Sequence, residues 1–598
     1  MLTSDPLAHL TCDAATKESV RQWLVGPYDS ESKSALLDLL KTNPQEVIDA
    51  FYTTLTFGTG GLRGVMGIGS NRMNRYTVMA ATQGLSDYLN MQPKKSALPN
   101  ASPLSVIIGY DSRLQSKCFA EASAKVLAAN GIQVYLFRDL RPTPLISFGC
   151  RQCQCSAAIM ITASHNPPQY NGYKVFWDDG GQVLSPHDKG IMRQVQKISS
   201  PYQIKSVSQL QHPLIAYVEE AVETAYLQAI YTLQYHPQTN QSDGSKLGIL
   251  YTNLHGTGIT LVPKILHSWG FTNLAYVEEQ KAPNGHFPTI EAPNPEDQSS
   301  LKLGIAQLQK SGRDLLIATD ADADRIGVVV NHHGNAIILD GHQLACLCLA
   351  HILESRAKQG IKIGNGAVVK TIVTTELFRA IANAYDCPCY DVLTGFKYIA
   401  QKIRAWELAP QGHDFIFGGE DSYGYLLGTY TRDKDAISAS ALICEMALQA
   451  KLQGKTLYDQ LQEIYRTYGI YRENLFSINF PDSQAGKKNM DSAMLHLRQS
   501  PPKSIANHAV IEVEDYLNST KTNQLTGETT ALSLPQSDVL FFWLDDGSKL
   551  VIRPSGTEPK IKIYSGVMTV DFANVADGIA ACEARAQEFT SALKKMLK

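Results

Sequence analysis

The sequence has little of what marks a membrane protein, a nucleic-acid binder or a secreted protein. Its longest apolar runs are of strand length, far short of the roughly 20 apolar residues that span a bilayer. Residues 1–15 lack the basic and apolar regions of a signal peptide. The formal charge is only −3 at pH 7, whereas a general nucleic-acid binder is usually strongly basic. We therefore expect a cytoplasmic protein that binds neither nucleic acid nor membranes.

Cysteine is also too scattered for a disulfide framework. Eleven cysteines, an odd number, are spread over 598 residues, which is typical of reduced thiols in a reducing compartment. Cys150, Cys153 and Cys155 lie close together and raise a zinc hypothesis, to which Cys387 and Cys389 add further ligands. Their spacing matches no zinc finger or ribbon, so ordinary thiols are the favoured interpretation.

What the sequence does contain is enough apolar material for several cores, since 44% of its residues are hydrophobic. Three helical patterns come first, and then strand-length apolar runs alternate with helical patterns. The alternation restarts after residues 199–211 and again near residue 340. This pattern predicts a soluble α/β protein with three consecutive doubly wound domains, mixed sheets and a C-terminal α+β domain around a central cleft. The expected domains are 1–205, 206–335, 336–467 and 468–598.

The expected elements follow from the same patterns. Helices are predicted at 19–25, 34–40, 44–52, 117–129, 259–269, 376–384, 398–406 and 574–597. Strands are predicted at 105–109, 132–137, 157–161, 248–252, 315–318, 367–372, 390–393, 415–417, 539–544, 549–552 and 560–564. The residues Asp545-Asp-Gly-Ser548 indicate a hairpin turn between two of the last three strands.

The stretch from Ala158 to Val175 is the first to carry chemistry. Ser164 follows the apolar run 157–161, so it is expected on a loop at the carboxyl end of a strand. His165 and Lys174 are residue types that move a proton or hold an anion beside a nucleophilic hydroxyl. Asn171-Gly172 is interpreted as a turn before the next apolar run. A solvated turn is the alternative for any single Ser-His pair.

A second loop carries three carboxylates at alternate positions. Asp320, Asp322 and Asp324 follow the apolar run 315–318 and make a hard oxygen site of the kind that Mg²⁺ prefers. A calcium-binding loop would need Gly and Glu where Arg325 and Asn331 stand. Three like charges repel unless a cation neutralises them, so a metal site is favoured over a charged turn.

Three further loops combine glycine with polar or charged side chains, and a fourth carries charged side chains without glycine. Gly-rich residues 57–64 carry Arg63, which can grip a phosphate through two hydrogen bonds. Residues 418–422 offer acceptors suited to sugar hydroxyls, with an acidic surface turn as the alternative, and residues 432–435 offer a cation. Residues 553–559 form a donor cluster suited to a phosphate.

Together these motifs resemble the α-D-phosphohexomutase superfamily along nearly the whole chain. The run Thr-Ala-Ser-His-Asn-Pro at 162–167 and the aspartate loop that ends in Arg325 carry the resemblance. It implies that Ser164 carries a phosphoryl group and that Asp320, Asp322 and Asp324 hold Mg²⁺ against it. The resemblance also assigns catalytic roles: Arg325 and Arg63 face the phosphoryl group, while His165 and Lys174 manage the proton of the attacking hydroxyl.

The substrate contacts also come from the resemblance. Glu420 and Ser422 would hold the sugar with Thr394 nearby, although Tyr423-Gly424 replaces the commoner Gly-His. Lys434 would contact the substrate, as would Arg63, Ser164 and Arg325. The phosphate that does not react would be gripped by four residues of one loop: Arg553, Ser555, Gly556 and Thr557.

The implied activity is transfer of a phosphoryl group between the 1- and 6-positions of glucose phosphate, through a phosphoserine and a sugar 1,6-bisphosphate. The branch with phosphoglucomutase type 2 and phosphopentomutase looks most similar. Pentose phosphates, a phosphomannomutase and a glucose 1,6-bisphosphate synthase stay open, as does a non-catalytic sensor. A serine acyl hydrolase would want Gly-x-Ser-x-Gly, whereas Thr162 and Asn166 flank Ser164. We expect a monomer or a weak homodimer.

Overall fold

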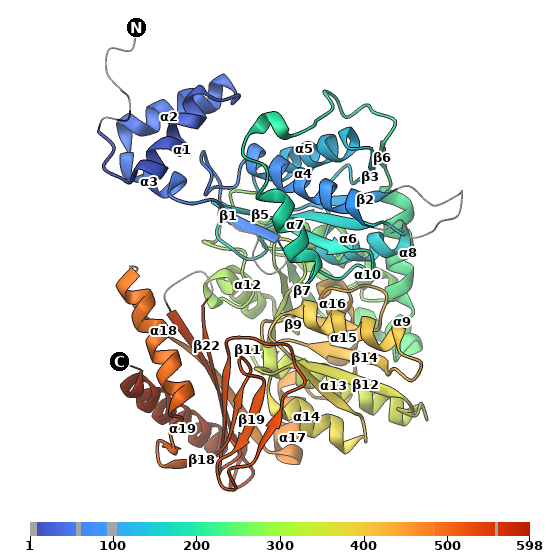
Figure 1. Ribbon diagram of the computed structural model, residues 1–598. Coiled ribbons are helices and arrows are strands. Elements are labelled where there is room, and N and C mark those ends of the chain that lie inside the picture. The colour runs from blue at the N-terminus through green and yellow to red at the C-terminus, as the bar shows by residue number, and fades with distance from the viewer. Residues whose placement is uncertain are drawn as a thin grey trace. The chain divides into compact units, whose positions relative to one another are not determined.

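The computed structural model describes Leu7 and residues 9–55, 61–92, 104–481, 484–555 and 560–597. The chain forms two compact units (Figure 1). The first comprises Met1–Ile338 and Gly424–Leu448, and the second comprises Leu339–Tyr423 and Gln449–Lys598. In the described ranges, no helix combines the length and the apolar character needed to cross a membrane.

Three short helices begin the first unit and have a small core of their own. They are α1 (Ala14–Val25), α2 (Ser30–Thr42) and α3 (Pro44–Phe51), as the sequence predicts. Trp23 and Phe51 meet edge to face in this core. The Tyr76 hydroxyl, at the start of the next helix, donates a hydrogen bond of 2.6 Å to Asp29, the N-cap of α2. The three helices are thereby tied to the domain that follows.

The first sheet has six strands in the order β1-β5-β4-β2-β3-β6. Strands β2, β3, β4 and β6 are parallel, while β5 runs antiparallel to both β4 and β1. The strands are β1 (Gly61–Val65), β2 (Ser105–Tyr110), β3 (Gln133–Leu136), β4 (Ala157–Ile161), β5 (Tyr170–Trp177) and β6 (Ile215–Tyr217). The sheet is therefore mixed, and the carboxyl ends of β2 and β4 lie at one edge.

Helices cover both faces of this sheet, because alternate residues of a strand point to opposite sides. Val106 and Ile108 of β2 share a core with α4 (Arg75–Met91) and α5 (Ser116–Ala129). Ile107 points the other way and packs on Gly149 of the opposite layer. That layer contains α6 (Thr143–Gln152) and α8 (Glu219–Tyr231), and α7 (His187–Val195) packs on α4.

Asn171 and Gly172 do not form the predicted turn. Both lie inside β5, which is squeezed between β4 and β1. A Cβ on Gly172 would stand 2.4 Å from the Thr162 carbonyl oxygen and 2.9 Å from that of Leu62. This glycine therefore permits close strand packing, which a pattern of local turn residues cannot distinguish from a turn.

The second sheet has five strands in the order β11-β10-β9-β7-β8. Strands β7, β8 and β9 are parallel, and β10 runs antiparallel to β9. The strands are β7 (Ile249–Thr252), β8 (Leu274–Tyr276), β9 (Leu315–Thr319), β10 (Ile326–His332) and β11 (Asn335–Leu339). The three aspartates thus occupy the loop between β9 and β10, at the carboxyl end of β9.

The helix predicted at 259–269 is divided. The 3₁₀ helix η3 (Thr257–Thr260) precedes α10 (Val262–Ser268). Pro263 lies in the first turn of α10, where a backbone N–H has no partner within the helix and proline is therefore tolerated. The other elements of the first unit are α9 (Pro237–Asp243), α11 (Glu278–Lys281), α12 (Gln298–Ser311), β15 (Tyr425–Leu427), most of α16 (Ala436–Leu452), η1 (Pro201–Gln203) and η2 (Gly244–Lys246).

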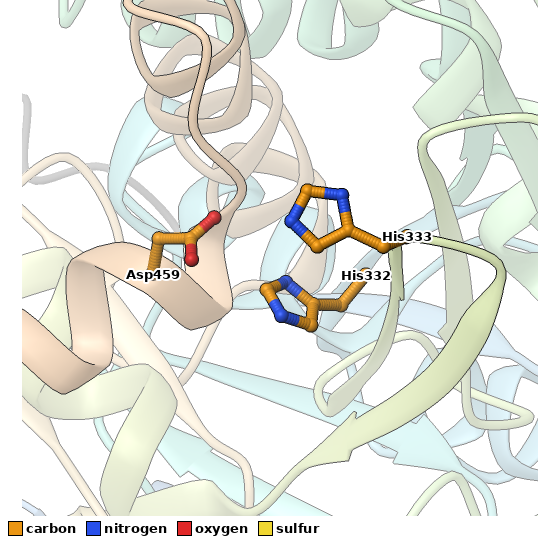
Figure 2. A group of neighbouring side chains, drawn as sticks. All are labelled: His332, His333 and Asp459. Carbon is orange, nitrogen blue, oxygen red and sulfur yellow. The ribbon is translucent and has the colours of Figure 1, made fainter.

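His332 and His333 end β10 and begin its hairpin with β11. Their rings lie side by side, with centroids 4.3 Å apart, and His333 has a left-handed φ of 52° (Figure 2). The aspartate loop joins the other end of β10. At about 3.3 Å per residue, the two imidazoles lie roughly 20 Å along the strand from that loop.

The second unit contains a parallel sheet and a larger antiparallel one. In the former, β12 (Gly366–Thr371) pairs with β13 (Cys389–Val392) and β14 (Asp414–Gly419). The helices are α13 (Gly341–Lys358), α14 (Glu376–Ala384), α15 (Phe396–Leu408), α17 (Leu457–Tyr468), α18 (Gln484–Gln499) and α19 (Val575–Met596).

The antiparallel sheet has the order β16-β23-β22-β21-β18-β19-β20, with β17 pairing to β18. Its strands are β16 (Ile470–Asn479), β17 (Ser504–Ile505), β18 (His508–Asp515), β19 (Thr520–Asn523), β20 (Thr529–Ala531), β21 (Leu540–Leu544), β22 (Lys549–Pro554) and β23 (Lys560–Thr569). The predicted hairpin is confirmed, since β21 and β22 are antiparallel partners. Sheet and helices α18 and α19 form the α+β end of the chain (Figure 1).

Candidate active site

Ser164 lies on the loop after β4, as its position in the sequence predicts. It is 3% exposed and has a left-handed φ of 51°, which an L residue rarely adopts. Its backbone N–H donates to the Thr162 hydroxyl at 2.8 Å. Its own hydroxyl stands 3.3 Å from Nδ1 of His165. The loop therefore presents one buried hydroxyl beside one imidazole.

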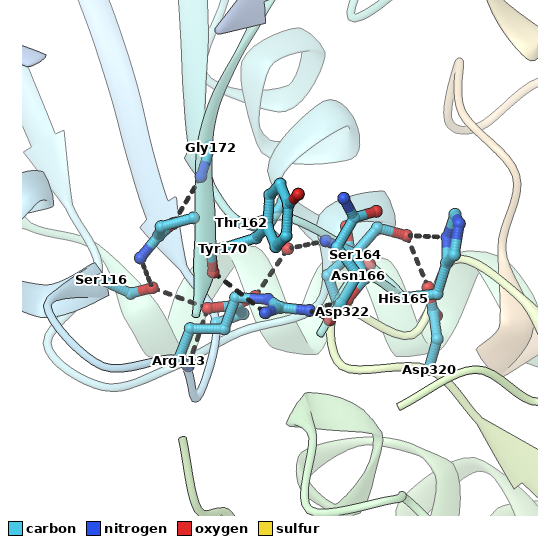
Figure 3. A network of polar contacts seen from close by, with 12 residues as sticks. Arg113, Ser116, Thr162, Ser164, His165, Asn166, Tyr170, Gly172, Asp320 and Asp322 are labelled. Carbon is cyan, nitrogen blue, oxygen red and sulfur yellow. Dashed lines mark hydrogen bonds and ion pairs between the residues drawn. The ribbon is translucent and has the colours of Figure 1, made fainter. Parts of the chain in front are cut away.

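The structure brings the serine loop and the aspartate loop together. The Ser164 hydroxyl donates a 2.7 Å hydrogen bond to Oδ2 of Asp320, which is 156 residues away in sequence (Figure 3). Oδ1 of Asp320 accepts the backbone N–H groups of Asp324 and Arg325, each at 3.0 Å. Ala323 in this loop is also left-handed, with a φ of 50°. Both loops thus hold a tight, locally strained main chain.

Two lysines neutralise part of the aspartate charge. Lys174 on β5 lies 2.7 Å from Oδ2 of Asp322 and 3.1 Å from Oδ2 of Asp324. Lys434, in the segment before α16, lies 3.0 Å from the same Asp324 oxygen. Burial opposes the charge of Lys174, but Asp322 and Asp324 outweigh it and raise its pKa. Lys174 is therefore held as a cation.

The three carboxylates nevertheless suit a further cation. Their oxygens come within 4.8 Å of one another. Oδ1 of Asp322 is buried and accepts no hydrogen bond from any residue that the structure describes. Burial and then the charges of Asp324 and Asp322 raise the pKa of Asp320 well above its usual value. A hard oxygen set with an unused buried acceptor fits Mg²⁺.

Arginines border the site on two sides. Arg63 extends from β1 and donates to the Asn166 side chain at 3.2 Å. Arg325 is bound by Glu296, with its Nε 3.9 Å from Asp324. Burial, followed by the charges of Arg325 and Arg63, lowers the pKa of His165 well below its usual value. The imidazole is therefore held in its neutral form.

Two residues at this site, Asp111 and Arg113, escaped the sequence analysis. They follow β2, the strand beside β4, and Figure 3 shows Arg113 reaching under the serine loop. Thr143, the first residue of α6, also contributes by donating to Asp322 Oδ2 at 2.5 Å. Asp111 and Arg113 could have been predicted from their position directly after a parallel strand, because loops at the carboxyl ends of parallel strands share one edge of the sheet.

The predicted sugar and distal phosphate contacts belong to the second unit. Glu420 is buried and Ser422 half-buried after β14, while Thr394 is half-buried before α15. Arg553 lies on β22, and the N–H of Ser555 donates to the Lys560 carbonyl at 2.8 Å. Gly556 and Thr557 lie outside the described residues. The roles of these residues stay predictions.

The three cysteines at 150, 153 and 155 carry no disulfide, and all eleven cysteines are free thiols. Burial raises the pKa of Cys155 to about 12. The Cys150 thiol donates to the Trp177 carbonyl at 3.2 Å. Within the described ranges, the groups able to hold a metal do not include a cysteine.

Comparison with known proteins places this fold and site. Family models described as Phosphoglucomutase/phosphomannomutase, alpha/beta/alpha domains I, II and III, match residues 54–202, 224–334 and 340–468. A phosphoglucomutase of Staphylococcus aureus strain MRSA252 is 37% identical over 537 residues, covering 89% of this chain and 93% of that protein. The phosphoglucomutase of strain MSSA476 is also 37% identical.

Solved structures share the fold at lower identity. A structure titled putative phosphomannomutase from Thermus thermophilus has a TM-score of 0.65 at 20% identity, over 91% of this chain and 99% of that one. The open form of parafusin, a phosphoglucomutase from Paramecium, has a TM-score of 0.65 at 16% identity, over 91% and 96%. These matches confirm three consecutive α/β domains followed by a β-rich domain.

Fold, site and relatives together define an isomerase of the intramolecular phosphotransferase class. The chain belongs to the phosphoglucomutase/phosphomannomutase family of the α-D-phosphohexomutase superfamily, which confirms the resemblance drawn from its motifs.

Proposed function

We propose that this enzyme moves a phosphoryl group between the 1- and 6-positions of glucose phosphate, with Ser164 as the residue that carries it. The observation behind the proposal is the 2.7 Å contact between the Ser164 hydroxyl and Asp320 inside the aspartate cluster. Glucose is the sugar because relatives at 37% identity are named phosphoglucomutases.

In the proposed step, a hydroxyl oxygen of the sugar phosphate attacks the phosphorus atom on Ser164. The new O–P bond forms as the bond to the serine oxygen breaks. The sugar hydroxyl gives its proton to a base, and the serine oxygen takes up a proton to become a hydroxyl again. His165 is neutral and its Nδ1 lies 3.3 Å from the serine oxygen, so it is the group best placed to carry a proton to and from that oxygen. The sugar bisphosphate formed in this step then reorients end to end in the site. Its other phosphoryl group is transferred back to Ser164.

Charge on the moving oxygens must be offset, because positioning and electrostatics supply nearly all of the catalysis in phosphoryl transfer. Lys174 and Lys434 contribute positive charge through their ion pairs with the aspartates, and Arg325 borders the same loop. Asp320, Asp322 and Asp324 would hold Mg²⁺, which when bound supplies further positive charge to the phosphoryl oxygens.

The test is to measure conversion of glucose 1-phosphate by wild-type enzyme and by Ser164→Ala, with glucose 1,6-bisphosphate and Mg²⁺ present. We expect turnover in the wild type and none above background in the variant. Intact mass should show one added phosphoryl group in the wild type alone. Full activity of Ser164→Ala would rule out the phosphoserine.

A substrate panel completes the test. Glucose 1-phosphate should give a higher kcat/KM than mannose 1-phosphate, ribose 1-phosphate or deoxyribose 1-phosphate. A preference for a pentose would correct the sugar and keep the chemistry. Formation of bisphosphate without mutase turnover would instead identify a synthase. A cytoplasmic location, the absence of nucleic-acid and membrane partners, and a monomer or weak homodimer stay predictions.

A further inference from the structure

We propose that Arg113 and Asp111 are positioning residues that clamp the Ser164 peptide on both sides and so aim its hydroxyl for phosphoryl transfer. This inference rests on the proposed function of Ser164. Neither residue touches the Ser164 hydroxyl or the aspartate cluster through a hydrogen bond that the structure records, so they would act through the main chain of the serine loop.

Arg113 holds the carbonyl side of the peptide. Its guanidinium is buried, with 3% of the residue exposed, and it binds four carbonyl oxygens of the serine loop. One terminal nitrogen donates to the Ser164 carbonyl at 2.6 Å and to the Asn166 carbonyl, and the other donates to those of Pro167 at 2.8 Å and Tyr170 at 3.0 Å. All four acceptors belong to one seven-residue stretch of chain.

Asp111 holds the amide side through a relay. Its carboxylate accepts the Thr162 hydroxyl at 2.6 Å and the Ser116 hydroxyl at 2.7 Å. The Thr162 hydroxyl in turn accepts the Ser164 N–H at 2.8 Å. Since the Thr162 proton is committed to Asp111, its oxygen is oriented to accept. Asp111 also forms an ion pair with Arg113, at 3.4 Å from its Nε, and accepts the Arg113 backbone N–H at 2.9 Å.

A clamp on both sides is needed because the serine backbone is strained. A left-handed φ is unfavourable for an L residue, and such a conformation persists only where its surroundings determine it. A small misplacement of a reacting group can cost about 100-fold in rate. Releasing either side would let Ser164 relax toward ordinary backbone angles and carry its hydroxyl away from Asp320.

A purely structural role explains the contacts less well. Burying an arginine is costly, and well-packed apolar residues often stabilise a core as well or better. This arginine instead directs both terminal nitrogens of its guanidinium to the serine loop. It also lies 5.2 Å over the ring of Phe287 and forms a β-bridge with Gly285. The clamp therefore also joins the serine loop to the domain that bears the aspartates.

The first test compares wild-type enzyme with Arg113→Lys, which keeps the charge but cannot reach four carbonyls from one point. Unphosphorylated enzyme is mixed with glucose 1,6-bisphosphate and Mg²⁺, and phosphorylation of Ser164 is followed by quenched-flow mass spectrometry. We expect the rate constant to fall at least 30-fold in Arg113→Lys. The KM for glucose 1-phosphate should change less than threefold, because the substrate contacts stay in place.

The second test cuts the other side of the clamp. Thr162→Val removes the hydroxyl that links Asp111 to the Ser164 N–H, and we expect at least a tenfold slower phosphorylation. The double variant should be about as slow as Arg113→Lys alone, because residues in one network do not act additively. If Arg113→Lys fails to fold, Thr162→Val carries the test by itself.

The matched control is Arg313→Lys. Arg313 also donates to backbone carbonyls, those of Asn273 at 3.0 Å and Ile249 at 3.3 Å, but at the start of β9 rather than its end. In the Arg313→Lys variant, Ser164 should become phosphorylated at the wild-type rate. The proposal is refuted if the rate constant of Ser164 phosphorylation stays within threefold of wild type in Thr162→Val and in any folded Arg113→Lys. It is also refuted if Arg313→Lys lowers that rate constant as much as Arg113→Lys does. Wild-type enzyme that never becomes phosphorylated would instead refute the proposed function.

Discussion

At the scale of single residues, the site is governed by three buried carboxylates that cannot all stay charged without help. Lys174 and Lys434 engage the Oδ2 atoms of Asp322 and Asp324. Asp320 is occupied by Ser164 and by two backbone N–H groups. Oδ1 of Asp322 and Oδ1 of Asp324 remain as buried acceptors with no hydrogen bond in the described part of the chain. These two oxygens are the acceptors that a divalent cation would satisfy.

The first prediction concerns Oδ1 of Asp322. Asp322→Asn should raise the Mg²⁺ concentration that gives half-maximal mutase activity at least tenfold, because a neutral amide replaces a charged ligand. EDTA should abolish wild-type activity, and added Mg²⁺ should restore it. The measurement is a Mg²⁺ titration of turnover at saturating glucose 1-phosphate.

Asp297→Asn is the matched control for that titration. Asp297 caps α12, where asparagine caps equally well, so its Mg²⁺ requirement should equal that of the wild type. An unchanged Mg²⁺ requirement in Asp322→Asn would remove this aspartate from the metal site.

At the scale of elements, the sequence predicted the strands that deliver the site, because each is a short apolar run with polar residues after it. The observed bounds of β4 are those predicted, and β9 differs from its prediction by one residue. Local pattern did not predict β1 or β5. Leu62 is the one fully buried residue of β1, and β5 contains Asn171 and Gly172, so neither has a continuous apolar signature.

Contacts between distant segments were equally out of reach. Arg113 follows β2, yet its importance depends on carbonyl groups more than 50 residues away. Composition suggests only a charged residue in a loop. Every residue has a backbone carbonyl group, so the sequence does not indicate which carbonyls accept hydrogen bonds from Arg113. A clamp of this kind can be recognised only in the folded structure.

A buried ionic cluster joins the parallel and antiparallel sheets of the second unit. Glu376 at the start of α14 lies 2.8 Å from Lys370 of β12 and 2.9 Å from Lys549 of β22. Its other oxygen lies 3.0 Å from Arg379. Burial raises the pKa of Glu376, but Lys549 and Lys370 outweigh that effect and hold it well below its usual value. The carboxylate thus ties the two sheets together.

The second prediction is that Glu376→Gln destabilises the second unit by about 3–5 kcal/mol, the usual cost of breaking a buried ion pair on one side. In the wild type, the folded chain keeps Glu376 ionised at pH values where the unfolded chain takes up a proton. Its stabilisation is therefore complete above an ordinary glutamate pKa of about 4.3 and is lost as the pH falls below it.

Urea unfolding between pH 3 and 7 measures this effect. Glu376→Gln should flatten the acid side of the stability profile, whereas Glu354→Gln, from an exposed pair on α13, should leave it unchanged. If both variants follow the wild-type profile, Glu376 contributes nothing to acid stability.

At the scale of the whole molecule, the chain divides the predicted chemistry between its two compact units. Ser164, which we propose to be phosphorylated, belongs to the first unit with the aspartates and their lysines, and the candidate sugar and distal phosphate residues belong to the second. Residues 424–448 return to the first unit and bring Lys434 to Asp324, 110 positions earlier in the sequence. Because the roles proposed for the two units differ, a variant in one unit should change one kinetic constant more than the other.

The third prediction uses that division. Arg553→Ala removes the arginine proposed to grip the phosphate that does not react, so KM for glucose 1-phosphate should rise about 10- to 100-fold. This range corresponds to the roughly 1.5–3 kcal/mol of a hydrogen bond to a charged group. The rate of Ser164 phosphorylation at saturating bisphosphate should fall far less, since Ser164 and the aspartates are untouched.

Arg498→Ala in the same unit should give the opposite result. Arg498 is bound to Asp515 at 3.0 Å and Asp538 at 2.6 Å, which makes it a structural arginine. Its loss should lower the melting temperature by several degrees and leave KM within twofold of wild type. Steady-state kinetics and thermal unfolding of both variants give the comparison. If Arg553→Ala instead lowers the melting temperature and keeps its KM, the loop that begins at Arg553 stabilises the second unit and does not bind phosphate.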